Sequence, residues 1–483
     1  MRAFLLTIAL VLACAAPVQA RQPVFTPTTV PPSGVIGVQD AYLSPDFWIE
    51  RQKAADAIVM DRAAIDAQNA RLMHIDASMH DLAALPATLD HAQVQAWIDH
   101  MSQRPDEPLF DAQGATVEAS ALDAIVANAN RDAVPERQPA RFGLAVHRAA
   151  LRTFPTGTRV FTERGDTDID RFQESALFPG TPVLIAHTSR DGRWLFVVSP
   201  RYAAWVDKDA IAEGSKDAVL AYADAAPYRL VTGAKVRTVF TPEEPRVSEL
   251  QLDMGVRVPL AQPAGGTPVN GQQPYTAWPI MLPVRNADGS LALATGLLQK
   301  NVDTSDAPLP LTRANIIRQA FKFLGERYGW GHDYNARDCS GFVSEVYRSM
   351  GVLMPRNTGD QGISPAFDRI HFEKTDAAEA RRAAVDQLQV GDLIYIPGHV
   401  MMMIGRIDNV PYVIHDTNGG SYLGADGAMH GMHLNGVSVT PLTPLRFNPT
   451  QTYVDRITNI VRMRPTAGAA QPTGGTTPTE GSP

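Results

Sequence analysis

The pattern of apolar residues changes several times along this 483-residue chain, and the changes fall at Pro-rich, Gly-rich or polar breaks. Residues 40–138 show helical spacing, 139–213 and 227–302 show short β runs, and 311–465 mix the two patterns. A single small module is therefore excluded. The chain is predicted to fold as several bodies that bury separate cores.

Residues 1–20 have the features of a signal peptide: a positive start, an apolar run too short to span a bilayer comfortably, and small residues at the end. In the alternative interpretation, cleavage before Cys14 leaves that residue lipidated and anchors the protein to a membrane. No later apolar run reaches the length of a transmembrane helix. We therefore expect an exported protein of the periplasm or cell envelope, with no transmembrane span.

The charge balance disfavours nucleic acid as a partner. Lys and Arg total 43 against 51 Asp and Glu, which gives a net charge of −8, and no dense basic run follows the sequence. The 2 cysteines exclude a disulfide-rich scaffold. Once residues 1–20 are removed, Cys339 is the sole thiol.

The domain boundaries follow from composition. Residues 21–39 are rich in Pro, Thr and Val and are predicted to form a linker, and residues 466–483 are predicted to be a disordered tail. Residues 40–138 are predicted to form a helical N-terminal domain, which Pro86 and the segment 105–108 break into about three helices.

Two β-rich segments follow. In residues 139–213, apolar runs at 183–185, 194–198 and 204–206 are separated by Pro-Gly and Asp-Gly turn signals. This order of parts resembles the bacterial SH3-like barrels attached to cell-wall enzymes. Residues 227–302, with a hairpin signal at Asn286-Ala-Asp-Gly289, are interpreted as a second barrel of that kind.

The segment 311–465 holds the densest functional signals. Residues 311–326 form one predicted helix and residues 338–350 a second, with Asp338 as its N-cap and Gly351 closing it. Cys339 then occupies the first turn. There, unpaired backbone N–H groups and the helix dipole would stabilise a thiolate and a developing oxyanion.

A cysteine nucleophile also needs an imidazole base and a polar group that orients it. The apolar β runs 399–404 and 410–415 are predicted to form a hairpin, and a turn centred near Ile407 places His399 directly opposite His415. Neither a metal site nor a cofactor is predicted. The other histidines of the segment are interpreted as structural or exposed: His332, His371, His430 and His433.

Together these residues resemble the NlpC-type papain-like cell-wall cysteine peptidases, in the multi-domain branch with two SH3-like barrels. The resemblance implies an α+β papain-like fold over residues 311–465 and hydrolysis of peptidoglycan stem peptides, commonly between γ-D-glutamate and diaminopimelate. It implies Cys339 as nucleophile, His399 as base and His415 as the orienting residue. The motifs that carry it are Tyr328-x-Trp-Gly, Asp338-Cys-Ser-Gly-Phe342, Pro355-Arg356, Gly391-Asp392-Leu393, Gly398-His399-Val400 and Val413-Ile-His415.

The same resemblance implies that the first barrel narrows the cleft and helps to select stem peptides with a free L-alanine amine. Asp338 would pair with that ammonium, and Tyr328, Trp330 and Ser340 would line the cleft. Related sequences often carry an acidic residue after Pro355-Arg356, where this chain has Asn357. The absent carboxylate puts strict selection of a free amine in question.

Two alternatives stay open at this stage. A catalytically inactive protein could keep the fold and use its barrels to hold cell-wall polymer. A papain-like amidase or acyl transferase would share the same Cys–His pair and differ only in its products. The scissile bond, the need for a free amine, lipidation at Cys14 and the oligomeric state are not fixed by the sequence.

Overall fold

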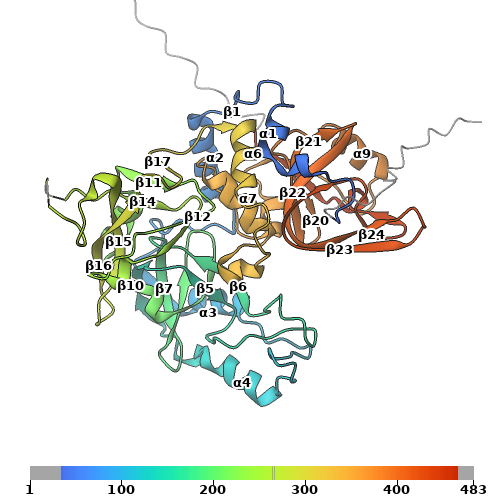
Figure 1. The fold of residues 1–483 in the computed structure, drawn as a ribbon. Coiled ribbons are helices and arrows are strands. Elements are labelled where there is room, and N and C mark those ends of the chain that lie inside the picture. The colour runs from blue at the N-terminus through green and yellow to red at the C-terminus, as the bar shows by residue number, and fades with distance from the viewer. Residues whose placement is uncertain (1–33, 264, 266, 466–483) are drawn as a thin grey trace, which may run out of the picture.

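The computed structural model describes residues 34–263, 265 and 267–465. The predicted signal peptide 1–20, the alternative lipidation site Cys14 and the tail 466–483 lie outside the described residues. The described chain runs from N-terminal helices through two β-rich bodies to a mixed body that contains Cys339 (Figure 1).

The N-terminal helices do not share one core. The stretch 36–38, within the predicted linker, and the first two α-helices bury apolar side chains against the C-terminal body, and Trp48 is fully buried there. The third and fourth pack against the first β body. A short helix has one narrow apolar stripe and must bury it on a neighbour. These helices are α1 (Pro45–Ile49), α2 (Arg62–Ile75), α3 (His91–Met101) and α4 (Ala119–Asn128).

The first β body is a seven-stranded antiparallel sheet with strand order β10-β4-β7-β8-β9-β5-β6. Trp205 is fully buried at its centre, in edge-to-face contact with Phe196. The expected turn glycines Gly180 and Gly192 have φ of 82° and 71°, which favours glycine. The strands are β4 (Arg141–Ala145), β5 (Ala149–Arg152), β6 (Gln173–Leu177), β7 (Pro182–Thr188), β8 (Trp194–Val198), β9 (Ala203–Asp207) and β10 (Ile211–Gly214).

The second β body consists of three small antiparallel sheets around a core of its own. Its longest ribbon is the hairpin at the sequence signal 286–289, with Ala277 opposite Gln299 and Arg285 opposite Leu291. The helix α5 (Lys216–Asp224) precedes this body. The strands are β11 (Tyr228–Val231), β12 (Lys235–Arg237), β13 (Gln251–Asp253), β14 (Arg257–Pro259), β15 (Ala277–Arg285), β16 (Leu291–Gln299) and β17 (Thr304–Ser305).

The C-terminal body is a six-stranded sheet with order β19-β26-β20-β21-β22-β23 and helices on both faces. Residues at even positions of β21 pack toward α6 and α7, and residues at odd positions pack toward α9. Its main elements are α6 (Arg313–Phe321), α7 (Cys339–Arg348), α8 (Thr358–Ile363), β19 (Asp368–His371), α9 (Ala378–Asp386), β20 (Leu393–Ile396), β21 (His399–Ile407), β22 (Val410–Leu423), β23 (Met429–Pro441) and β26 (Asn459–Arg462).

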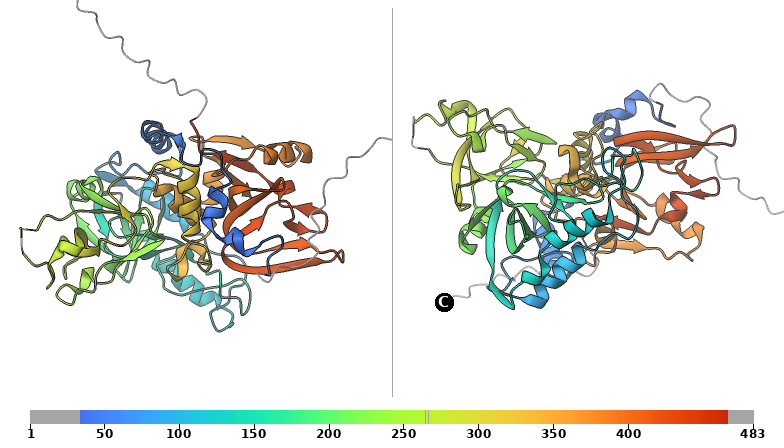
Figure 2. Two further views of the ribbon diagram at one scale, coloured as in Figure 1. Left: turned by 45° about the horizontal axis from the view of Figure 1, so that its top comes forward. Right: turned by 90° about the horizontal axis from the view of Figure 1, so that it is seen from below.

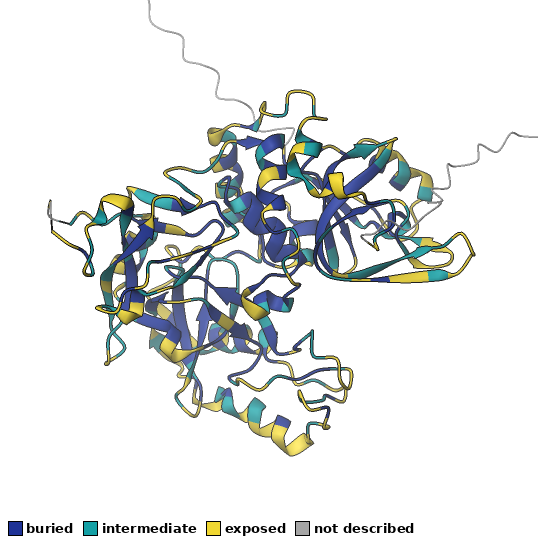
Figure 3. Ribbon diagram, viewed as in Figure 1, coloured by how far each residue is buried: buried dark blue, intermediate teal, exposed yellow. Residues whose placement is uncertain are grey.

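The helices α6 and α7 lie in the middle of the molecule. Two further views keep them between the β-rich bodies and the C-terminal sheet (Figure 2). These central helices are drawn largely as buried residues (Figure 3), and nine of the ten residues of α7 are buried. The N-terminus of α7 is therefore held by packing on several sides, which suits a residue that must be positioned accurately.

Candidate active site

Cys339 is the first residue of α7, and Asp338 caps the helix as the sequence predicts: its Oδ1 accepts the N–H of Gly341 at 2.8 Å. The cysteine is 5% exposed, and the backbone N–H of Val400 is directed at its sulfur. The sulfur therefore lies against the start of β21, one residue after His399.

The structure brings His399 and His415 together. The two rings make a hydrogen bond of 2.8 Å between Nε2 of His399 and Nδ1 of His415, and Nε2 of His415 contacts Oγ1 of Thr440 at 3.0 Å. His415 is 1% exposed, whereas His399 is a partly exposed residue. The result is a chain of three polar groups in which Nδ1 of His399 has no hydrogen-bond partner among the residues that the structure describes.

The pairing of the two strands differs from the sequence expectation. The turn lies at Asp408-Asn409, and a bulge between Met403 and Gly405 shifts the register, so that Met402 stands opposite Ile414. Continued toward the open end, this register makes His399 and His415 diagonal neighbours on one face rather than directly opposed residues. Diagonal neighbours stay within reach of long side chains, and the two rings still meet.

The surroundings of the sulfur oppose its ionisation, contrary to the expectation from its place on the helix. Burial, followed by the negative charge of Asp338, raises the pKa of Cys339 to about 12. Burial also lowers the pKa of His399 to about 4. The helix N-terminus does not offset desolvation and an adjacent carboxylate, and both pKa shifts favour a neutral thiol and a neutral imidazole.

This protonation state predicts how the thiol reacts with an alkylating reagent. The rate of carbamidomethylation of Cys339 by iodoacetamide should rise about tenfold per pH unit between pH 7 and pH 9.5 without levelling off, because the thiolate fraction is still growing. The rate is measured by mass spectrometry on the peptide that contains Cys339. A plateau below pH 8 would mean that the sulfur is ionised at rest.

Asp338 already has a cationic partner. Arg356 donates from Nη2 to its Oδ2 at 2.7 Å and from Nη1 to its Oδ1 at 3.2 Å. Burial alone would raise the pKa of Asp338, but the charges of Arg356 and then His332 outweigh it, so its pKa lies well below the usual range. Asp338 is therefore a buried carboxylate whose charge is already paired with a guanidinium group before any substrate amine binds.

The other predicted substrate-binding residues are arranged around this pair. Tyr328 is buried, and burial, followed by the charge that Cys339 carries once ionised, raises its pKa, so its hydroxyl stays protonated. Ser340 follows Cys339 on α7 and accepts from Nη1 of Arg356 at 2.8 Å. Trp330 is partly exposed at the start of a short 3-10 helix, and Asn357 is exposed at the N-terminus of α8.

Sequence reasoning left several residues of this site without a role. Arg356 also contacts Ser175 of the first β body at 2.7 Å and His332 at 2.8 Å, so it links that body to the nucleophile helix. From the same body, Tyr202 donates to Glu174 at 2.6 Å and lies beside Asn357. Arg356 stood in the Pro355-Arg356 motif and Tyr202 in a segment typical of the SH3-like barrel, but neither pattern indicated a role in the site.

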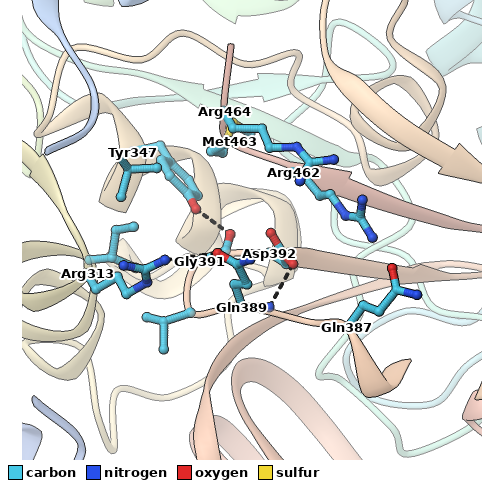
Figure 4. Close-up of a pocket in the computed structure, with 12 residues that line it drawn as sticks. Arg313, Tyr347, Gln387, Gln389, Gly391, Asp392, Arg462, Met463 and Arg464 are labelled. Carbon is cyan, nitrogen blue, oxygen red and sulfur yellow. Dashed lines mark hydrogen bonds between the residues drawn. The ribbon is translucent and has the colours of Figure 1, made fainter. Parts of the chain in front are cut away.

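The Gly391-Asp392-Leu393 motif belongs to a different place. It borders a pocket of about 310 Å³, also lined by Arg313, Arg462 and Arg464 (Figure 4). Asp392 accepts the N–H of Gln389 at 2.8 Å, and Tyr347 donates to the carbonyl of Gly391. Tyr347 lies eight residues after Cys339 on α7, about 12 Å along the helix. The motif therefore shapes the turn before β20 and does not contact the nucleophile.

The environment of Asp392 predicts how the stability of the protein depends on pH. Burial raises its pKa to about 6, so the folded state holds a proton that the unfolded state releases near pH 4. Stability contributed by this carboxyl therefore falls as pH rises from 4 through 6. Asp392→Asn, which keeps the acceptor for Gln389, should raise the free energy of unfolding by about 1–3 kcal/mol at pH 7.5 and change it little at pH 4. Urea unfolding at both pH values measures this, and an equal change at both would contradict it.

Within the described part of the chain, no group of three or more His, Cys, Asp or Glu side chains is arranged to hold a metal ion. No helix among the described residues combines the length and the apolar composition needed to cross a membrane.

Comparison with protein families agrees with the motifs. Residues 325–446 match the NlpC/P60 family, and residues 159–207 match the SH3 domain of the SH3b1 type. The chain therefore carries an NlpC/P60 domain, with Cys339, His399 and His415 inside it, preceded by an SH3b1-type domain. The expected α+β papain-like fold is confirmed for the C-terminal body.

Curated relatives share part of this chain. A γ-D-glutamyl-L-lysine dipeptidyl-peptidase of Bacillus cereus (strain ATCC 10987 / NRS 248) is 29% identical over 157 residues, which are 31% of this chain and 41% of the relative. The dipeptidyl-peptidase 6 of Lysinibacillus sphaericus is 30% identical over 95 residues, 20% of this chain and 30% of the relative. The chain thus spans less than half of the length of each relative.

A solved structure is similar over nearly its whole length. The NlpC/P60 endopeptidase from Photobacterium damselae subsp. piscicida superposes with a TM-score of 0.69, covering 86% of this chain and 96% of that chain at 16% identity. The likeness extends well beyond the C-terminal body. It shows that the arrangement of N-terminal segment, β bodies and catalytic-type domain is one fold shared with that protein.

Proposed function

We propose that this chain is an exported cysteine endopeptidase that cleaves peptidoglycan stem peptides between γ-D-glutamate and the diamino acid. The observation that carries the proposal is the sulfur of Cys339, held at the N-terminus of α7 against the start of β21, where the His399–His415 pair begins. The γ-D-glutamyl-L-lysine peptidase activity for which the Bacillus cereus relative is named supports the choice of bond, and the predicted signal peptide supports export to the periplasm or cell envelope.

The hydrogen-bond chain sets the tautomers that catalysis needs. For Nδ1 of His399 to accept a proton, its Nε2–H must donate to Nδ1 of His415, and Nε2–H of His415 must donate to Thr440. Burial, followed by the neighbouring His399, lowers the pKa of His415 well below its usual value, so this ring stays neutral. His415 therefore orients His399 without adding a charge.

The first chemical step forms a bond from sulfur to the γ-glutamyl carbonyl carbon. The thiol proton moves to Nδ1 of His399 as the sulfur attacks, because the resting thiol is neutral. The carbonyl oxygen becomes an oxyanion. In the described structure the backbone N–H groups of Cys339 and Ser340 have no acceptor, and the protonated hydroxyl of Tyr328 lies nearby, so these donors are available to it.

The second step breaks the carbon–nitrogen bond. The imidazolium of His399 gives its proton to the leaving amine of the diamino acid, which departs and leaves a thioester on Cys339. Water, deprotonated by His399, then attacks the thioester carbon. The acid is released, and the thiol takes back its proton from His399.

Substrate selection rests on the groups beside the nucleophile. Asp338 is paired with Arg356, and Asn357 is neutral, so the carboxylate nearest to a bound amine is already compensated. A further carboxylate near this region is Glu174 of the first β body. It accepts a hydrogen bond from Tyr202, which lies beside Asn357. Recognition of a free L-alanine amine is therefore shared between the two bodies, and loss of that amine should weaken turnover without abolishing it.

The test uses the full chain and two defined stem peptides, one with a free L-alanine amine and one acetylated there. Mass spectrometry should detect a diamino-acid fragment from both, together with L-alanyl-D-glutamate from the first peptide and N-acetyl-L-alanyl-D-glutamate from the second. The kcat/KM for the acetylated peptide should be lower by no more than about 100-fold. With a muropeptide as a third substrate, release of the intact stem peptide from muramic acid would instead identify an amidase. Absence of any product, with tight co-sedimentation with intact cell wall, would identify an inactive binding protein.

A further inference from the structure

A cavity of about 240 Å³ lies where the two β bodies meet the catalytic-type domain. Its walls come from the loop after β6 (residues 178–182), from Arg201, from the segment 255–259 of the second β body and from Arg348 of α7. Cys339 and His399 do not line it. Arg356, His332, Ser175 and Tyr202 also line it, so the cavity adjoins the candidate active site without including its nucleophile or its base.

Two arginines with unused donors face this cavity. Arg201 donates from Nη2 to Oγ of Ser344 at 3.0 Å and to the carbonyl of Pro355 at 3.2 Å, and Arg348 donates from Nη2 to the carbonyl of Met254 at 2.9 Å. Among the described residues, Nε and Nη1 of both side chains have no acceptor, and neither guanidinium forms an ion pair with a carboxylate.

The neighbouring acids are committed elsewhere. Asp338 is paired with Arg356, and Glu345 accepts from Arg337 at 2.9 Å. Burial and then the positive charges of Arg348 and Arg356 lower the pKa of Arg201 to about 9. An arginine nevertheless keeps its proton in a protein, so the cavity holds like charges with unfilled hydrogen-bonding capacity. A bound anion would balance the two positive charges and would also accept hydrogen bonds from the unused donors.

We propose that this cavity binds a small organic anion that carries a carboxylate. A carboxylate accepts hydrogen bonds from guanidinium N–H groups, and the cavity offers the free Nε and Nη1 donors of two arginines. Phe178, Val256 and Leu353 give the walls an apolar part, and the guanidinium of Arg348 lies 5.0 Å from the centre of the Phe178 ring. The volume equals that of about eight water molecules, which accommodates an apolar body of roughly ten heavy atoms.

The experiment measures binding of three probes to the full chain at constant ionic strength. 3-Phenylpropionate carries a carboxylate on an apolar body, 3-phenylpropanamide has the same shape without charge, and inorganic phosphate has charge without the apolar body. Isothermal titration should show saturable binding of the carboxylate, with a rise of several degrees in the unfolding midpoint. The amide should bind at least about tenfold more weakly.

Variants assign the binding to this cavity. Arg201→Gln and Arg348→Gln should each weaken binding of 3-phenylpropionate at least about tenfold, whereas Arg237→Gln, on an exposed position of the second β body, should leave it unchanged. Each variant keeps an amide donor and removes an unpaired charge, so the unliganded fold should survive; if one fails to fold, the other decides. Absence of saturable binding, equal binding of the amide, binding of phosphate alone, or binding unaffected by a folded variant would overturn the proposal.

Discussion

Replacing Cys339 with alanine should lower the release of diamino-acid fragments from defined muropeptides at least about 1,000-fold, to the level of a protein-free blank. Beyond residue 20 the sequence contains no other cysteine that could form the thioester. Direct attack by water, without a thioester intermediate, is much slower than attack by the sulfur. The measurement is product formation by mass spectrometry, with substrate well above the enzyme concentration. Undiminished release would reject the proposed mechanism.

The control for this loss of activity is a variant of another buried residue that does not contact the sulfur. Asp392→Asn changes a buried side chain of the same domain without contact to Cys339, and it should retain turnover. Circular dichroism and the unfolding midpoint of Cys339→Ala should stay close to those of the unmodified chain, because only one sulfur atom is removed. Equal losses in both variants would indicate a general folding defect instead of a missing nucleophile.

Features encoded within a few residues were predictable from the sequence. The helix that begins at Cys339, its cap Asp338 and its closing Gly351 depend on local backbone chemistry, and the structure reproduces them. The turn glycines of the first β body and the hairpin at 286–289 follow from the same kind of signal.

Features that depend on contacts between residues far apart in the sequence could not be predicted. The bulge that shifts the β21–β22 register lies at Gly405, where an added Cβ atom would come within 2.7 Å of Trp48, more than 350 residues earlier. No local sequence pattern indicates that Trp48 packs against Gly405. The helices expected to form a separate N-terminal domain are likewise divided between two cores by contacts that only the folded chain defines.

The charge environment of the sulfur escaped prediction for the same reason. A helix N-terminus by itself favours a thiolate, and the adjacent Asp338 opposes one unless a partner engages it. The structure adds the burial of Cys339, and burial together with the charge of Asp338 reverses the direction of its pKa. Arg356 compensates Asp338 rather than the sulfur, because its guanidinium faces that carboxylate.

Arg337→Met should destabilise the protein by about 3–5 kcal/mol at pH 8. Arg337 is fully buried and donates from Nε to Glu345 of α7 at 2.9 Å and from Nη2 to Asp253 of the second β body at 2.8 Å; it also pairs with Glu326. One guanidinium thus joins the β body to the nucleophile helix, and its loss leaves buried carboxylates without their countercharge. Urea unfolding followed by tryptophan fluorescence measures the loss.

The pH dependence separates this mechanism from simple loss of packing. Buried carboxylates that lose a cation gain raised pKa values in the folded state, so the folded variant takes up protons as pH falls and recovers stability. The deficit of Arg337→Met should therefore shrink between pH 8 and pH 5. Arg104→Met, which breaks an exposed ion pair with Asp123, should cost less than about 1 kcal/mol at either pH. A deficit for Arg337→Met that is independent of pH would mean that the guanidinium acts there through its volume, and that the β body is held to the nucleophile helix by apolar packing instead of by charge.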